Sequence, residues 1–395
     1  MGQINVVGIT ASDDRNFNEE VRLLVQKNKV FFGSEKQKES VRDLLREDYQ
    51  WNLLDNERDI SLDHILKEKE DIVIFTYGDP WFYGIGSYLL ENVSKDRIQI
   101  FAQKNIILTL CHKTYTNYNR LTNINLSGLG WEVLDEVLLD QRSLIGILTD
   151  KNYSPDQIAN RMQDYGYDNY QMIVGENLGV EGERIRHLEI QEAQDLNFKE
   201  LNCVLLQKKY HKYHDFGIAD LDLKGMHGSR NQITKMPVRL TALHALHLEG
   251  KSCLWEVGYG TGSLSLEAKR QFPALKVIGF EREEQCQDLL IKNARNLGIP
   301  GVKSIIGDFL DLDLSELPRP DAVFIGGHDR NVKSILDKIH HYLNDNGMIV
   351  ISTIDNISRE SFFKWAAENK YSINYQSCIK VDAYNAVDII SCRKS

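Results

Sequence analysis

Three glycines at alternate positions and one acidic residue are the residues of this sequence best suited to hold a polar small molecule. Gly258, Gly260 and Gly262 follow the mostly apolar run 253–257 and precede a helical pattern. Glycine has no Cβ, so this turn can bring bare backbone N–H groups and a helix N-terminus against a ligand. Glu281 ends the next apolar run, about 20 residues further on, where a carboxylate can accept both hydroxyl groups of a ribose. The spacing predicts a nucleoside site, and an acid that only caps the next helix is the alternative.

Alternating strand and helix patterns must position these residues. Runs rich in aliphatic residues end at Glu281, at Asp308 and at the glycine pair 326–327, and helical patterns lie between them. This alternation predicts a Rossmann-like α/β domain in the C-terminal half, and the N-terminal half shows the same rhythm. His328 follows the glycine pair. It could steer a carboxylate or a proton, or it could be a helix-capping or loop histidine.

The glycine spacing distinguishes between nucleotide classes. A dinucleotide fingerprint needs a third glycine at the sixth position, where this chain has Ser263. The series from Glu256 to Gly262 instead resembles the first motif of class I S-adenosyl-L-methionine-dependent methyltransferases. The resemblance implies that this cofactor is bound by Thr234, Glu256, Gly258, Tyr259, Gly260, Thr261, Gly262, Glu281, Asp308 and Phe309.

Several blocks between residues 215 and 355 are more specific. The pairs Thr234-Lys235 and Glu281-Arg282 and the runs 254–258, 263–268 and 321–327 resemble the decarboxylating precorrin methyltransferases of cobalamin synthesis. We hypothesise catalytic roles for Thr234, Lys235 and His328, with Thr234 and Lys235 closing over cofactor and substrate. The substrate would carry many carboxylates, and the basic residues near the glycine turn that could form a rim for them are Lys224, Arg230, Lys235 and Arg239.

The N-terminal half has its own strand-to-helix turn. The apolar run 71–77 leads into Gly78-Asp79-Pro80-Trp81-Phe82-Tyr83-Gly84, and the ends of such strands are where open α/β sheets bind ligands. A tight turn plugged by aromatic side chains is the alternative. The heptapeptide resembles the motif of the tetrapyrrole methyltransferase family. This resemblance implies a two-lobed α/β domain in which Gly78, Asp79 and Tyr83 contact the cofactor.

The N-terminal half also departs from that family. Residues 8–13 replace its usual glycine-proline-glycine loop, and residues 104–130 lack its usual Pro-Gly-x-Ser-Ser and Ser-x-His-Gly-Arg segments. Two interpretations therefore stay open for this half. It is either a second methyltransferase or a degenerate domain that only binds a tetrapyrrole or mediates assembly.

The order of the two halves adds a functional prediction. The polar stretch 208–214 predicts a division into residues 1–209, a tetrapyrrole (precorrin C5) methyltransferase-like domain, and residues 216–395, a class I decarboxylating C15 methyltransferase domain. This order resembles the bifunctional precorrin C5,15-methyltransferases. That family methylates a precorrin at C5 and C15 with S-adenosyl-L-methionine and removes the ring C acetate carboxyl group, in cobalamin biosynthesis.

Composition and net charge argue for or against several partners, metal sites and classes of function. A formal net charge of −10 argues against nucleic acid as a partner and disfavours a class I methyltransferase that acts on RNA. The six scattered cysteines predict neither a zinc site nor a disulfide framework, and we expect no bound metal. Without a signal sequence or a long apolar run, the chain is predicted to be cytoplasmic and not to contact membranes. The expected partner is an anionic tetrapyrrole, in a homo-oligomer as in relatives of both halves. A small-molecule methyltransferase and a nicotinamide dehydrogenase remain alternatives.

Overall fold

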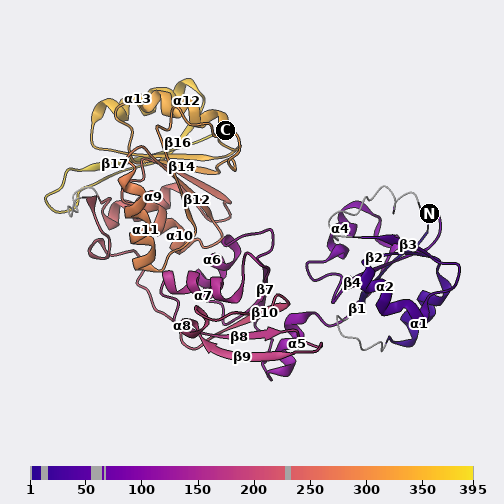
Figure 1. Cartoon of the computed structure of the whole chain (residues 1–395). Coiled ribbons are helices and arrows are strands. Elements are labelled where there is room, and N and C mark those ends of the chain that lie inside the picture. Colours follow the sequence, from indigo (N-terminus) through magenta and orange to yellow (C-terminus); the bar gives the residue numbers. More distant parts are fainter. Residues whose placement is uncertain (1, 10–16, 55–64, 66–67, 227–232, 395) are drawn as a thin grey trace. The chain divides into compact units, whose positions relative to one another are not determined.

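The computed structural model describes residues 2–9, 17–54, 65, 68–226 and 233–394 (Figure 1). Its strands form three sheets, two in the N-terminal half and one in the C-terminal half. Helices alternate with strands in both halves, so the predicted α/β class is confirmed. In the described part of the chain, we find no helix with the length and apolar character needed to cross a membrane.

The first sheet is parallel, with the order β3-β2-β4-β1-β5. Its central strands β1 and β4 are mostly apolar, because nearly all of their residues are buried on both faces of the sheet. The helix α2 begins with a capping box in which Ser34 and Gln37 each bond the other's backbone. The elements are β1 (Ile4–Ile9), α1 (Glu19–Lys27), β2 (Val30–Gly33), α2 (Glu35–Val41), η1 (Arg42–Leu44), β3 (Gln50–Leu53), β4 (Ile72–Tyr77), α4 (Ile85–Asn92), η2 (Lys95–Arg97) and β5 (Ile98–Phe101).

The second sheet is mixed, with the order β6-β7-β10-β8-β9. β6 and β7 run parallel, whereas β10 is antiparallel to β7 and β9 is antiparallel to β8. Its helix α5 starts at Asn105, whose side chain accepts a hydrogen bond from the backbone of Leu108 over 2.8 Å. The elements are α5 (Ile106–Lys113), β6 (Leu121–Asn125), α6 (Glu132–Leu139), β7 (Leu144–Leu148), α7 (Pro155–Asp164), β8 (Tyr170–Glu176), β9 (Arg184–Glu189), α8 (Ile190–Ala193) and β10 (Asn202–Lys208).

The third sheet has the order β13-β12-β11-β14-β15-β17-β16, parallel except for β17, which is antiparallel to both neighbours. The strand order reverses between β11 and β14, and open α/β sheets bind ligands beyond the carboxyl ends of the strands at such a point. The strands and helices that were predicted for this half are present. The elements of this half are η3 (Asp220–Asp222), α9 (Met236–Leu246), β11 (Cys253–Val257), α10 (Ser263–Gln271), β12 (Lys276–Glu281), α11 (Gln285–Leu297), β13 (Val302–Ile306), β14 (Ala322–Ile325), α12 (Val332–Tyr342), β15 (Met348–Thr353), α13 (Asn356–Glu368), β16 (Ser372–Ile379) and β17 (Val387–Arg393). Neither η3 nor α13 was predicted.

Two apolar cores hold this sheet in place. α12 and α13 pack over one face, where Trp255 and Phe280 are buried, and α9 and α10 pack over the other, where Leu254 and Val277 are buried (Figure 1). Because both faces are covered, the strands are rigid supports for the loops at their carboxyl ends. The candidate site therefore lies at the carboxyl ends of strands that are held rigidly in the third sheet.

The chain folds into two compact units, and each unit is built from three separate segments of the sequence. Tyr167, after α7, donates a hydrogen bond to the carbonyl of Gly298 over 2.9 Å, and Arg295 pairs with Asp164 at 2.9 Å. These contacts join the end of α7 to the third sheet, and α6 belongs to the same unit. The predicted division at residues 209–216 assigns both helices to the first half. The units are Met1–Gly128, Ser143–Ile158 and Gln171–Gln207, and Leu129–Arg142, Ala159–Tyr170 and Lys208–Ser395.

Candidate active site

The glycine turn after β11 requires glycine for geometric reasons. Gly258, Gly260 and Gly262 all have positive φ, at 73°, 54° and 75°. A Cβ on Gly258 would lie 2.6 Å from Cα of Gly327, so the turns that follow β11 and β14 approach closely. No described atom lies within 4 Å of the position of a Cβ on Gly260. The turn is therefore tightly packed at Gly258 and open at Gly260, where a ligand could approach the backbone.

Glu281 faces this turn from the end of the neighbouring strand β12. Its Oε2 accepts a hydrogen bond from the backbone N–H of Gly260 over 2.9 Å, and its Oε1 accepts one from the backbone of Arg282 over 2.9 Å. These donors hold the carboxylate at the carboxyl edge of the sheet. The structure thus brings together the glycines and the acid that the sequence singled out.

A cavity of about 160 Å³ lies at the same edge. Its lining includes Gly258, Glu281, Asp308, Phe309 and His328, all of which the sequence analysis named. Phe309 is buried, and its ring packs edge-on against that of Phe280 with 5.1 Å between centroids. The cavity therefore has an aromatic wall and acidic groups at its rim, a lining that suits an adenosine.

Three predicted cofactor residues have side chains that point into the protein. The carboxyl group of Glu256 is buried and accepts a hydrogen bond from the Ser265 hydroxyl, and burial raises its pKa to about 8. The hydroxyl of Tyr259 contacts that of Ser304 at 2.7 Å. Thr261 is buried as well. These side chains support the turn, and none of the three residues is among the described residues that line the cavity.

His328 lies beside the cavity, and loop contacts hold its ring. Nδ1 accepts a hydrogen bond from the backbone of Arg330 over 3.3 Å and lies 3.5 Å from the Ser358 hydroxyl. Burial lowers the pKa of His328, although Asp355 and Asp329 oppose the shift. A neutral imidazole at pH 7 follows, which can accept or donate a hydrogen bond without carrying charge.

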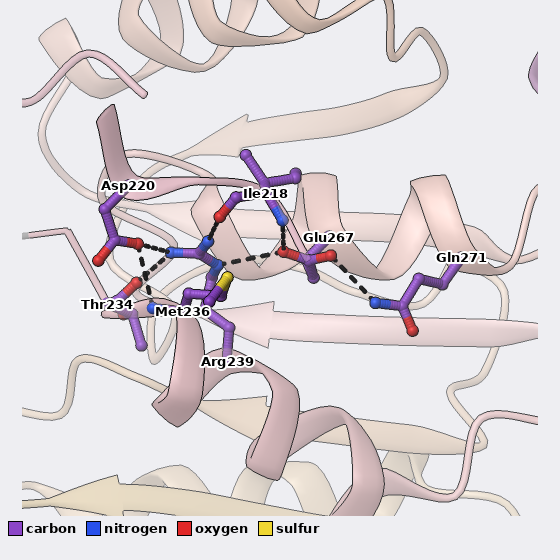
Figure 2. Close-up of polar contacts among 7 residues, drawn as sticks. All are labelled: Ile218, Asp220, Thr234, Met236, Arg239, Glu267 and Gln271. Carbon is purple, nitrogen blue, oxygen red and sulfur yellow. Dashed lines mark hydrogen bonds and ion pairs between the residues drawn. The ribbon is translucent and has the colours of Figure 1, made fainter. Parts of the chain in front are cut away.

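Thr234 and Lys235 lie just before α9 and are not among the described residues that line this cavity. The Thr234 carbonyl accepts a hydrogen bond from Nη1 of Arg239 over 2.5 Å, and Nζ of Lys235 lies 4.3 Å from the centroid of the Tyr384 ring. The prediction that Arg239 belongs to an exposed basic rim is wrong, because its side chain is fully buried among acidic partners (Figure 2). Arg230 lies outside the described residues.

Asn293 on α11 was not predicted to have a role of its own. It is fully buried, and its Nδ2 donates a hydrogen bond to the carbonyl of Thr261 in the glycine turn over 3.0 Å. A signal was available, since a polar residue three positions after the apolar Leu290 shares its helical face. Burial on that face could have been inferred, but its partner could not.

The N-terminal turn forms a second candidate site. Gly78 has φ 71°, and Oδ1 of Asp79 accepts a hydrogen bond from the backbone of Trp81 over 2.9 Å. Tyr83 has φ 56°, unusual for a residue with a side chain, and its hydroxyl donates to the carbonyl of Asn123 over 2.9 Å. The turn borders a cavity of about 1040 Å³ whose lining includes Phe75, Tyr77, Trp81, Phe82, Tyr83 and Tyr88. This aromatic lining suits a large flat ligand.

Each half of the chain is similar to a known protein family. Residues 3–194 match the Tetrapyrrole (Corrin/Porphyrin) Methylases, and residues 226–382 match the Precorrin methyltransferase domain. Precorrin-6Y C(5,15)-methyltransferase (decarboxylating) of Sinorhizobium sp is 22% identical over 382 residues, covering 89% of this chain and 84% of that protein. The protein of that name from Mycobacterium tuberculosis is 25% identical over 371 residues, covering 89% and 87%.

A separate, shorter relative matches about a third of the chain. Cobalt-precorrin-6B C(15)-methyltransferase (decarboxylating) of Salmonella typhimurium is 33% identical over 129 residues, covering 33% of this chain and 66% of that protein. Each half thus matches a family of its own, and the two longer relatives each cover 89% of the chain. The chain is therefore similar to the tetrapyrrole methylases over residues 3–194 and to the precorrin methyltransferase domain over residues 226–382.

Proposed function

We propose that this chain uses S-adenosyl-L-methionine to methylate a precorrin at C5 and C15 and removes the ring C acetate carboxyl group, in cobalamin biosynthesis. The observation that carries this proposal is the pairing of two methyltransferase families in one chain, in the same order as in relatives that cover 89% of it. We assign C5 methylation to residues 1–209 and C15 methylation with decarboxylation to residues 216–395.

The second half has residues that fit the cofactor. Glu281 presents a fixed carboxylate to which ribose hydroxyls can donate, and the open side of Gly260 leaves room beside the turn. Phe309 offers an apolar wall, and Asp308 stands next to it at the rim of the same cavity. Glu256, Tyr259 and Thr261 contribute by holding the turn in shape, the first two through Ser265 and Ser304.

The proposed methyl transfer requires the protein mainly to position the substrate against the cofactor. S-adenosyl-L-methionine supplies a methyl group on a sulfonium centre, so the protein needs no serine or cysteine nucleophile. Loss of the acetate carboxyl group as carbon dioxide leaves an electron pair on carbon that must take up one proton. His328 is our candidate to guide that proton or the departing carboxylate. Thr234 and Lys235 are our candidates to close over the substrate, with Lys235 offering a cation to its carboxylates.

The first half has a large aromatic cavity for the macrocycle. We assign Gly78, Asp79 and Tyr83 to its cofactor site, where the positive φ of Tyr83 lets the hydroxyl reach Asn123. Strained backbone of this kind persists where surrounding contacts hold it, which occurs often at functional sites. The missing glycine-proline-glycine loop does not remove this turn, so we propose that this half is catalytic.

We further propose that the enzyme works in the cytoplasm as a homo-oligomer. All six cysteines are free thiols, and five of them are buried, as expected for a reducing compartment. Titration calorimetry of the full chain with S-adenosylhomocysteine tests the two-site proposal. Two binding sites per chain would support it, whereas one site would show that only one half holds the cofactor.

A further inference from the structure

Asn293 ties two stretches of backbone together. Its Oδ1 accepts a hydrogen bond from the backbone N–H of Lys224 over 2.7 Å, and its Nδ2 donates to the carbonyl of Lys224 over 3.1 Å. The same Nδ2 donates to the carbonyl of Thr261 over 3.0 Å. One buried amide therefore pairs with Lys224 as a neighbouring strand would, and also holds the glycine turn.

Arg239 contacts the chain both before and after residues 225–233. Its Nη1 donates to the Thr234 carbonyl over 2.5 Å and to Oδ1 of Asp220 over 2.7 Å, and its Nη2 donates to the Ile218 carbonyl (Figure 2). Its Nε lies 3.4 Å from Oε2 of Glu267 on α10. All three guanidinium nitrogens are therefore engaged, which no other side chain could reproduce.

The partners of Arg239 are themselves fixed. Oδ1 of Asp220 also accepts a hydrogen bond from the backbone of Met236 over 3.0 Å, and Oε2 of Glu267 accepts one from the backbone of Ile218 over 2.8 Å (Figure 2). Arg239 and Glu267 are both fully buried. A buried ion pair is retained only when its remaining hydrogen-bonding groups are satisfied, as they are here.

Both connections lead to the glycine turn. Glu267 belongs to α10, the helix that begins at Ser263 directly after Gly262. Ile218 and Ile233, which flank these contacts, pack in the same apolar core as Tyr259 of the turn. The backbone before and after residues 225–233 is thus joined to one rigid base.

We propose that Asn293 and Arg239 are positioning residues of the second site. Asn293 sets the shape of the glycine turn through Thr261, whereas Arg239 sets the position of Thr234 and therefore of Lys235. The inference rests on the proposed function of this half. It adds separate roles for the two residues. Asn293 affects how the cofactor is held, and Arg239 affects where Thr234 and Lys235 lie relative to the substrate.

Two conservative variants of the full chain separate these roles. Asn293→Asp keeps the size and the acceptor but replaces the donor that faces two carbonyls. Arg239→Lys keeps the charge beside Glu267 but loses the planar guanidinium group with its several N–H donors. We expect Asn293→Asp to raise the Kd of S-adenosylhomocysteine, measured by calorimetry, about tenfold or more, because a misplaced turn weakens every contact it makes. We expect Arg239→Lys to change that Kd less than about twofold but to lower kcat for C15 methylation about tenfold or more.

Gln271→Met is the matched control, because Gln271 bonds the Oε1 of Glu267 over 3.0 Å without touching either backbone stretch. It should change neither quantity. If Arg239→Lys does not fold, Asp220→Asn, at a side chain that is 29% exposed, tests the same connection. Equal effects of the two variants on Kd and kcat, or no effect of either, would overturn the inference. A wild-type chain that binds no S-adenosylhomocysteine and transfers no methyl group at C15 would instead overturn the proposed function.

Discussion

The carboxylate of Glu281 and the backbone N–H of Gly260 are joined by a hydrogen bond of 2.9 Å, although 21 positions separate them in the sequence. The parallel pairing of β11 and β12 creates this contact, since it places Val257 beside Phe280 and so brings both strand ends to one edge. The glycine turn and a fixed acid thus face one another, and each can be tested separately.

Glu281→Gln should weaken cofactor binding strongly. The amide keeps an acceptor for Gly260 but loses the charge, and a hydrogen bond to a charged group contributes about 1.5–3 kcal/mol. We therefore expect the Kd of S-adenosylhomocysteine for the second site to rise about 10- to 100-fold in calorimetry. Glu283→Gln, at an exposed neighbour, is the control. An unchanged Kd for Glu281→Gln would remove Glu281 from the site.

Gly258→Ala should destabilise the protein more than Gly250→Ala. The two glycines have φ of 73° and 72°, so a side chain costs about 1–2 kcal/mol in backbone strain at either position. Only at Gly258 would the new Cβ meet Cα of Gly327, at 2.6 Å; at Gly250 no described atom lies within 4 Å. Urea unfolding should show a larger loss of unfolding free energy for Gly258→Ala, together with loss of cofactor binding. Equal losses would contradict the close approach of the two turns.

Glu256 should make stability fall as pH rises. Burial raises its pKa from 4.5 to about 8, so the native state holds a proton that the unfolded state releases. Between these two values, the unfolding free energy should decrease by up to about 1.4 kcal/mol per pH unit from this group. Glu256→Gln keeps an acceptor for Ser265 and should flatten the decline between pH 6 and 8. A variant with the same pH dependence as the wild type would show that Glu256 ionises normally.

His328 should titrate below an ordinary histidine. Burial lowers its pKa, so the folded state binds a proton less tightly than the unfolded state, whose pKa is 6.5. Its contribution to stability is therefore present above pH 6.5 and is lost as the pH falls through the lower folded value. NMR titration of the ring, assigned with a His328→Gln variant, measures this. A pKa at or above 6.5 would mean that the ring is solvated or paired with acid.

The sequence predicted the parts of the site that depend on local pattern. The alternating runs gave the strands of the third sheet, and the glycine spacing with Glu281 gave the edge at which the site lies. Side-chain direction could not be predicted, because Tyr259 lies between two glycines and its inward turn depends on Ser304, a tertiary partner. Arg239 was misassigned for the same reason, since only the fold brings Glu267 and Asp220 to it.

In the proposed reaction, one chain adds a methyl group at two positions and removes one carboxyl group. The most direct measurement is mass spectrometry of the product after the full chain reacts with precorrin-6Y and trideuteromethyl-labelled S-adenosyl-L-methionine. We predict a product that has gained two labelled methyl groups and has lost one carboxyl group as carbon dioxide. A product with one labelled methyl group would leave one half without a catalytic role, and an unmodified macrocycle would contradict the account.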